Sequence, residues 1–350
     1  MTLHIFNPEH DLALASGLSN FTAPHAGRQL RHDLSWLPAL WANNDDVVLV
    51  EDVEKAHRAI NRRKVKPCLL AGKQQLASLP ISSIEPWGWN KALRAQLLRL
   101  GIDEQLMPTE AALAEIRNLS HRRTAAMLLP HLQQECTVGE AHECTTEDQV
   151  KELMERYENI VIKAPWSSSG RGIRFFTIHN SPLTSISWLR NVISRQGSVM
   201  VEPYYHKVKD IGMEFMSDGQ GNVTYLGLSL FHTTNGAYKG NLIATEQAKR
   251  QLLGRYIPLE LLDTTQQKIC QLLGKVFENK YRGPFGVDMM VIKSTQPSLH
   301  PCVEINLRRT MGHMALALGQ KTNPTSDDDI RHVMRIDYTD KHYKLRIKRL

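Results

Sequence analysis

The sequence has 350 residues, a length that suggests two or three domains. Of these residues 42% are hydrophobic and 23% charged, which is typical of a globular protein. The five cysteines are odd in number and form no Cys-x-x-Cys pair, so neither a disulfide framework nor a zinc site is indicated. The first residues are too acidic and too poor in apolar side chains for a signal peptide, and no run approaches the length of a membrane span. We therefore expect a cytoplasmic protein without a membrane partner.

The net charge of +7 includes two basic clusters, one from Arg62 to Lys66 and one from Lys341 to Arg349. Clustered Lys and Arg can bind the phosphate backbone of nucleic acids, but these clusters are short and no zinc-finger or RRM-type motif accompanies them. A charged surface together with a site for an anionic nucleotide explains them more simply. Nucleic acid is therefore the less favoured partner.

Residues 1–115 alternate between strand-like and helix-like patterns. The expected elements are a strand over Leu3–Phe6, a helix over Ala26–Trp41, a strand over Val47–Val50, a charged helix to Arg63 and a strand over Cys68–Leu70. Strands separated by helices indicate a parallel, doubly wound sheet. We expect this part of the chain to be an α/β domain.

A polar cluster, Asn7-Pro8-Glu9-His10-Asp11, directly follows the first strand. Ligands of open α/β sheets gather at the carboxyl ends of the strands, so the cluster could contact a substrate. The alternative is that Asp11 or Asn7 caps the helix starting near Leu12, with His10 on the surface, and we favour it.

The segment from Asn159 to Phe176 predicts a strand, a loop and a second strand. The first strand is apolar and ends at Lys163, and the loop is built from small residues, namely Ser167, Ser168, Ser169, Gly170 and Gly172. Such a loop presents many backbone N–H groups that can surround phosphates, and Lys163 would add a positive charge. A surface hairpin with a solvated lysine fits this stretch equally well. The spacing excludes P-loop and dinucleotide-binding motifs.

Two later strands carry polar side chains on one face. Asp288 lies in the apolar run from Gly283 to Ile292, and Glu304 and Asn306 alternate with apolar residues further on. If the strands form a hairpin closed by residues 293–299, Asp288 lies opposite Glu304, and two facing carboxylates need a cation. Oxygen ligands indicate Mg²⁺ or Mn²⁺. The alternative is an exposed face with ordinary acids.

Three basic residues are candidates for contacts with reacting groups. Arg308 and Arg309 follow the second of these strands and could hold charge on a transferring phosphoryl group. Lys239 lies in a segment rich in Asn, Thr and Gly and is our candidate for contact with a substrate carboxylate. A hairpin turn at Asn235-Gly236 explains that segment about as well.

As an ordered set, these motifs resemble the ATP-grasp superfamily, ATP-dependent ligases that mostly join a carboxylate to an amine through an acyl phosphate. The resemblance covers about Arg122 to Gly312 and consists of the strand lysine before a Ser/Gly loop, a hinge-like VEPYY, an aspartate in GxDxMV and a final ExN followed by arginine. It implies α/β and α+β architecture with a doubly wound domain over 1–115, a small ATP-grasp subdomain over 116–200 and a large subdomain over 201–350 with a basic tail.

The resemblance also implies a role for each matching residue, with ATP as the nucleotide and Mg²⁺ or Mn²⁺ as the metal. Lys163 would contact the α- and β-phosphates beneath the loop from Ser167 to Gly172. The other implied contacts are the adenine edge for Glu202 and the backbone of Tyr204 and Tyr205, the ribose hydroxyls for Asp210, and two Mg²⁺ ions for Asp288, Glu304 and Asn306.

Two positions depart from the family's pattern. A lysine is usual near the start of the small subdomain, where this chain has Arg122 and Arg123, and either arginine could replace it. Pro203 removes a backbone donor from the hinge, which leaves the adenine contacts to its neighbours.

The implied activity is phosphoryl transfer from MgATP to a small carboxylate, followed by attack of an amine or thiol. A site of Lys, Arg, backbone amides and metals suits a reaction that depends on positioning and charge neutralisation. No GxSxG elbow or protein-kinase motif is present. The alternatives are a small-molecule kinase or phosphotransferase on the same fold and a non-catalytic nucleotide-binding protein. The chain could form a homodimer.

Overall fold

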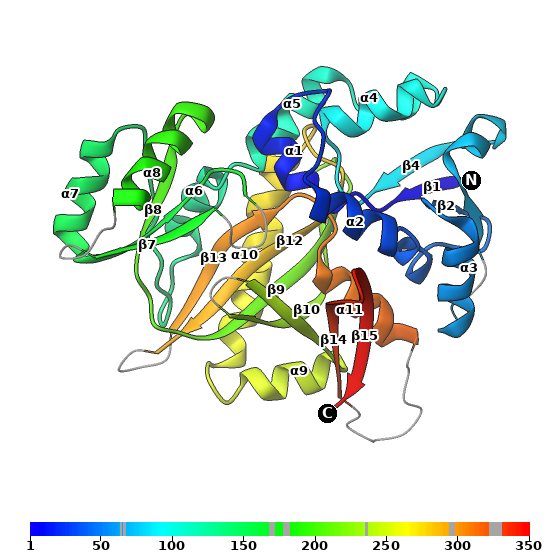
Figure 1. Ribbon diagram of the computed structural model, residues 1–350. Helices are drawn as coiled ribbons and strands as arrows, with labels where there is room; N and C mark the ends of the chain where they lie inside the picture. Colours follow the sequence, from blue (N-terminus) through cyan, green and yellow to red (C-terminus); the bar gives the residue numbers. More distant parts are fainter. Residues whose placement is uncertain are drawn as a thin grey trace. The chain divides into compact units, whose positions relative to one another are not determined.

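The computed structural model describes residues 1–63, 65, 68–167, 172–177, 183–234, 237–293, 298–321 and 331–350 (Figure 1). Packing divides the chain into two units. Unit 1 comprises Met1–Arg117, Gly240–Ala244 and Arg308–Leu350, and unit 2 comprises Asn118–Lys239 and Thr245–Leu307. The chain therefore enters and leaves each unit more than once. The three segments expected from the sequence stay a prediction.

Unit 1 contains a four-stranded sheet of order β3-β2-β1-β4, in which every neighbouring pair is parallel. The strands are short: β1 (Thr2–Ile5), β2 (Val47–Leu49), β3 (Leu69–Ala71) and β4 (Ser83–Pro86). The helices between the strands are α1 (His10–Ser16), α2 (His25–Leu34) and α3 (Val53–Arg62), with short 3-10 turns at Leu37–Leu40 and Lys73–Ser78. After β4 follow α4 (Lys91–Arg99), a 3-10 turn at Glu104–Leu106 and α5 (Glu110–Leu119). The parallel sheet expected for the N-terminal part is confirmed.

The first long helix is shorter than expected. The pattern predicted a helix over Ala26–Trp41, but α2 ends at Leu34 and the chain continues as a 3-10 turn that contains Pro38. Proline has no N–H to donate to the carbonyl four residues earlier and its ring clashes with that carbonyl. The α-helix therefore cannot run through this position.

The rest of unit 1 comes from the end of the chain. It contains α11 (Met311–Lys321) and the antiparallel pair β14 (His332–Thr339) and β15 (His342–Arg349), with β14 also paired to Asn241–Ile243. Met314, Met334 and Leu345 are buried in one apolar cluster with Phe6 and Val48. The beginning and the end of the sequence thus share a core.

Unit 2 contains a small antiparallel sheet of order β5-β8-β6-β7. Its strands are β5 (His142–Cys144), β6 (Asn159–Lys163), β7 (Ile173–Thr177) and β8 (Val199–Pro203), and its helices are α6 (Arg123–Leu132), α7 (Glu147–Tyr157) and α8 (Leu183–Gln196). Thr146 caps α7 by accepting from the N–H of Gln149. Ile160, Ile162 and Val201 form the buried face.

Unit 2 also contains a larger antiparallel section of order β13-β12-β9-β10. The strands are β9 (Lys207–Ser217), β10 (Val223–Thr234), β12 (Gly283–Ile292) and β13 (Ser298–Asn306), joined through β11 (Ala237–Ile243), α9 (Glu246–Leu253) and α10 (Leu259–Phe277). Phe215, Phe277 and Phe285 pack together, with ring centroids 5.1 and 5.0 Å from that of Phe285. Figure 1 shows β12 and β13 running side by side in orange.

Within the described ranges, none of the helices combines the length and the apolar character that crossing a membrane requires.

Candidate nucleotide and metal site

The two late strands form the hairpin that the alternating pattern predicted. In its register Asp288 on β12 lies directly opposite Glu304 on β13, and the amide nitrogen of Asn306 donates to Asp288 Oδ2 over 3.1 Å. β13 begins at Ser298 and so includes Pro301. The proline is tolerated because β13 is the edge strand of the sheet and its pairing with β12 is irregular between Glu304 and His300. Part of the closing segment lies outside the described residues. The predicted juxtaposition of Asp288 and Glu304 is confirmed.

Lys163 at the end of β6 forms a buried ion pair with Glu202 on β8. The distance from Lys163 Nζ to Glu202 Oε2 is 2.6 Å. Val161 is the residue directly opposite Glu202, and Lys163 lies two positions further on the same face, so the two charged side chains are diagonal neighbours. The strand pairing, rather than a flexible loop, holds them together.

Cys302 on β13 lies near both this ion pair and the carboxylates of the hairpin. Burial raises the pKa of its thiol, and three nearby carboxylates raise the pKa further, those of Asp288, Glu202 and Glu304. Lys163 is also close enough to affect this thiol, and its positive charge acts to lower the pKa of Cys302. The lysine of β6 and the acids of β12 and β13 therefore all lie near one buried residue of unit 2, Cys302.

Arg122, just before α6, lies in this site. Its Nη2 is 2.9 Å from Glu304 Oε1 and 3.3 Å from Ser167 Oγ, and its Nε donates to the carbonyl of Ala164. Arg123 points elsewhere, since it pairs with Glu143 at 3.4 Å and its side chain is 42% exposed. Of the two arginines left open by the sequence, Arg122 is the one beside the carboxylates.

The Ser/Gly loop begins and ends beside Arg122. The N–H of Ala164 donates to the carbonyl of Gly172 over 2.8 Å, which closes the base of the loop. A Cβ on Gly172 would lie 2.3 Å from Ser167 Cβ, so this closure needs a residue without a side chain. Ser168, Ser169 and Gly170 lie outside the described residues.

A family model matches part of the chain that carries this site. Residues 121–231 match the family model described as carbamoyl-phosphate synthase L chain, ATP binding domain. No curated protein sequence matches the chain.

Solved structures match nearly the whole chain. N5-carboxyaminoimidazole synthetase from Staphylococcus aureus with ADP has a TM-score of 0.51 and 14% identity over 97% of this chain and 83% of that one. A biotin carboxylase complex with β,γ-ATP from Campylobacter jejuni has a TM-score of 0.52 and 14% identity over 97% and 76%. The biotin carboxylase domain dimer of the Hydrogenobacter thermophilus 2-oxoglutarate carboxylase, with MgADP, ADP and bicarbonate, has a TM-score of 0.51 and 13% identity over 97% and 75%.

The chain has the ATP-grasp fold. The resemblance to this superfamily, drawn from the motifs of its sequence, is confirmed, and so is the expected mixed α/β architecture.

In this ATP-grasp chain the hinge residues already have partners of their own. The N–H of Tyr204 donates to the carbonyl of Asn159 over 3.0 Å, so an adenine contact of that residue falls to its carbonyl oxygen. The ring of Tyr205 packs edge-on against His300. Asp210 accepts from the Thr233 hydroxyl over 2.7 Å and pairs with Lys207 at 2.7 Å, so a ribose would compete with both. Their nucleotide contacts stay predictions.

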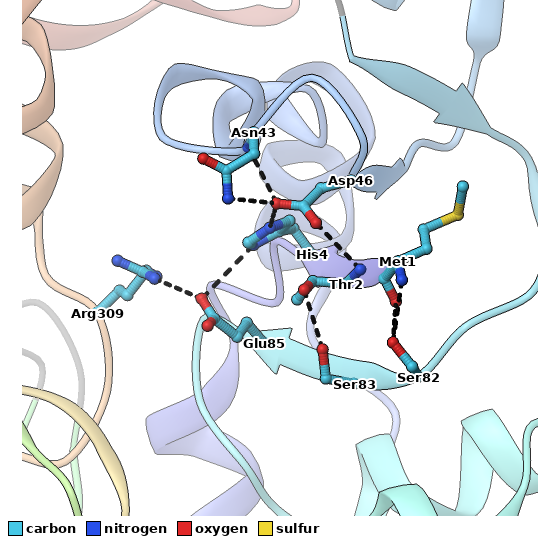
Figure 2. A network of polar contacts seen from close by, with 9 residues as sticks. All are labelled: Met1, Thr2, His4, Asn43, Asp46, Ser82, Ser83, Glu85 and Arg309. Carbon is cyan, nitrogen blue, oxygen red and sulfur yellow. Dashed lines mark hydrogen bonds and ion pairs between the residues drawn. The ribbon is translucent and has the colours of Figure 1, made fainter.

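The three basic residues proposed for the reacting groups lie in different surroundings. Lys239 is exposed on β11. Both oxygens of Asp11 accept from Arg308, at 2.8 Å each. Arg309 stacks on Trp41 and donates to Glu85, 2.8 Å away (Figure 2). Arg308 and Arg309 thus each bind a carboxylate of unit 1.

The structure corrects the favoured interpretation of the polar cluster after β1. Glu9 is the N-cap of α1 without a side-chain bond, the Asn7 amide donates to the carbonyl of Gly88, and Asp11 binds Arg308. His10 is 1% exposed rather than on the surface, and burial lowers its pKa to about 4. Helix capping was the wrong expectation because longer-range partners occupy these side chains.

Sequence reasoning did not single out His300 or Cys302. Both lie on β13, and His300 is buried, with neither ring nitrogen hydrogen-bonded to any residue that the structure describes. Burial is the main reason why the pKa of His300 is lowered to about 4. The nearby Glu202 acts to raise this pKa, and Lys163 acts to lower it. The alternation that placed Glu304 and Asn306 on one face extends back to these residues and could have identified them.

The hairpin offers suitable ligands for a divalent cation. Among the residues that the structure describes, no three His, Cys, Asp or Glu side chains are arranged so that they alone could hold a metal ion. Asp288 and Glu304 instead provide carboxylate oxygens, and Asn306 provides an amide oxygen while its nitrogen binds Asp288. An all-oxygen set with two carboxylates suits Mg²⁺ or Mn²⁺ that also binds phosphates and water.

Proposed function

We propose that this chain is an ATP- and Mg²⁺-dependent ligase that joins a small carboxylate to an amine or thiol through an acyl phosphate. The observation that carries this proposal is that the Lys163–Glu202 pair and the Asp288–Glu304 pair lie around the same buried position, Cys302. Neighbours described as a synthetase and a carboxylase, in complexes with ADP or ATP, support it.

Each residue has a task in this proposal. Lys163 binds phosphate oxygens, and Glu202, released from part of its pairing, accepts from the adenine amino group. Arg122 holds the base of the Ser/Gly loop and a phosphate. A divalent cation on Asp288, Glu304 and Asn306 would neutralise phosphate charge.

Phosphoryl transfer to a carboxylate needs alignment and charge neutralisation more than a protein nucleophile. We propose Lys239 for the substrate carboxylate, and Arg308 and Arg309 for the charge on the transferring group. For Arg308 this requires its bonds to Asp11 to open. The substrates themselves are of the class of small carboxylates and amines.

A substrate screen tests the proposal. ADP and phosphate release is measured over amino acids, short peptides and other small carboxylates, each with and without an amine, and with hydroxylamine to trap an acyl phosphate as a hydroxamate. We expect ADP release that needs a carboxylate, and hydroxamate formation in the same reactions. Lys163→Met should remove both, whereas Lys91→Ala, at a partly exposed ion pair with Glu110, should not.

The screen also separates the alternatives. A stable phosphorylated product without any need for an amine identifies a phosphotransferase. Nucleotide binding without ADP release in every reaction identifies a non-catalytic protein and overturns the ligase proposal.

A further inference from the structure

Arg122 is fixed at three points of unit 2. Its Nε donates to the Ala164 carbonyl over 3.1 Å, and its Nη2 lies 3.3 Å from Ser167 Oγ and 2.9 Å from Glu304 Oε1. The side chain is 6% exposed. Because the guanidinium is planar, the bond at Nε also sets the direction in which Nη2 points, so the contact with Glu304 is held in place.

This contact places a positive charge beside the two facing carboxylates of the hairpin. Asp288 and Glu304 face each other across two strands, and two carboxylates this close repel unless a positive charge lies beside them. In the present structure the Arg122 guanidinium supplies that charge to Glu304. It therefore occupies Oε1 of Glu304, one of the two carboxylate oxygens that this residue could offer to a metal ion.

A divalent cation and a guanidinium cannot share one carboxylate oxygen cheaply, because the two positive charges repel at short distance. Arg122 gives up Glu304 most easily when another anion is offered to it. Nucleotide phosphates are such an anion, and bidentate binding of phosphate is what the guanidinium fork favours. A metal ion alone offers Arg122 no replacement.

We propose that Arg122 is the counter-ion of Glu304 until a nucleotide arrives, so that metal binding to this hairpin depends on nucleotide. The inference rests on the proposed function for the identity of the ligands. It assigns Arg122 a positioning role: it moves from a metal-ligand carboxylate to a phosphate, and its bond to Ser167 couples that movement to the base of the Ser/Gly loop.

The experiment measures Mn²⁺ binding to the full-length protein by EPR, first without nucleotide and then with a non-hydrolysable ATP analogue. Wild type should bind Mn²⁺ weakly alone. Arg122→Met keeps an unbranched buried side chain but removes the charge, so we expect Mn²⁺ alone to bind at least about tenfold tighter, with weaker binding of the analogue. Arg122→Lys, which keeps the charge but loses the fork, should lie between the two.

Arg123→Met is the matched control, because it removes the neighbouring charge without touching Glu304. It should bind Mn²⁺ as wild type does. The inference is overturned if wild type binds Mn²⁺ alone as tightly as Arg122→Met, or if Arg123→Met gives the same gain. If Arg122→Met does not fold, Arg122→Lys alone decides, since unchanged Mn²⁺ affinity in it overturns the inference. Failure of wild type to bind the analogue with Mn²⁺ would instead reject the proposed function.

Discussion

The ammonium of Lys163 lies 2.6 Å from the carboxylate of Glu202, and only 7% and 6% of these two side chains are exposed. A pair so deeply buried is costly to break from one side, because the remaining charge has neither water nor a partner. The same two groups are proposed to bind the nucleotide. A substitution in this pair should therefore change both the free energy of unfolding and the binding of nucleotide. Comparing single and double variants separates the two effects.

Lys163→Met should lower the free energy of unfolding by about 3 kcal/mol, because it leaves Glu202 charged and unpaired in the interior. The double variant Lys163→Met/Glu202→Leu should recover most of that loss. Urea unfolding measures the stability, and fluorescence titration with an ATP analogue should detect no binding in either variant. A double variant that binds the analogue like wild type would contradict the site assignment.

Asp288→Asn should weaken metal-dependent nucleotide binding by more than about tenfold, since it removes one of two facing charges while keeping the side chain's size. The amide can still accept from Asn306, so the fold should be retained. Calorimetric titration of the ATP analogue with and without Mg²⁺ measures the effect. Asp263→Asn, at a half-exposed ion pair with Arg250, is the control and should bind as wild type does.

His300→Phe should stabilise the protein at acidic pH. The pKa of His300 is lowered from 6.5 to about 4 by burial, so the unfolded chain binds a proton in this interval and the folded chain does not. His300 therefore contributes a loss of stability as pH falls from about 6.5 to 4, up to about 3 kcal/mol. Phenylalanine fills similar space without nitrogens that lack hydrogen bonds.

The check for His300→Phe is urea unfolding at a series of pH values. The stability of wild type should fall more steeply than that of the variant between pH 6.5 and 4, and the two curves should run parallel above this interval. Equal slopes throughout would show that the imidazole is not held neutral.

Asp46→Asn should destabilise unit 1 at neutral pH. Burial alone would raise the pKa of Asp46, but donors from the backbone of Asn43 and Thr2 and from His4 lower it to about 2 (Figure 2). A lowered pKa means stability that is complete above about pH 4 and is lost as pH falls towards 2. We expect a deficit of about 2 kcal/mol at pH 7 that closes on acidification.

Thermal or urea unfolding at pH 7 and near pH 2.5 measures this difference. Asp45→Asn, at the exposed neighbouring position, provides the comparison and should change little. A deficit of Asp46→Asn that persists unchanged at pH 2.5 would argue against the charge as its cause.

Features of this chain that depend on local periodicity were predictable. The alternation around Asp288 and Glu304 gave both strands and their facing register, because a short connection and a period of two leave few other pairings. The end of α2 was also predictable from the sequence, because Pro38 cannot lie inside the α-helix that we expected over Ala26–Trp41.

Other features required contacts between distant segments. Arg122 and Arg123 are adjacent and chemically identical, and only the packing of α6 against β13 decides which one meets Glu304. The pairing of Lys163 with Glu202 follows from the β6–β8 register, which no local pattern specifies. His10 is buried because the Gly88 and Asn90 region, far along the chain, covers it.

Unit 1 closes its core with side chains that lie far apart along the chain. Phe6 and Val48 are translated long before Met314, Met334 and Leu345, which pack in the same apolar cluster. Until the segment with the later residues is translated, this cluster lacks part of its packing, and exposed apolar surface of this kind favours aggregation of the nascent chain. A C-terminal truncation before Arg308 would make that unfinished state permanent.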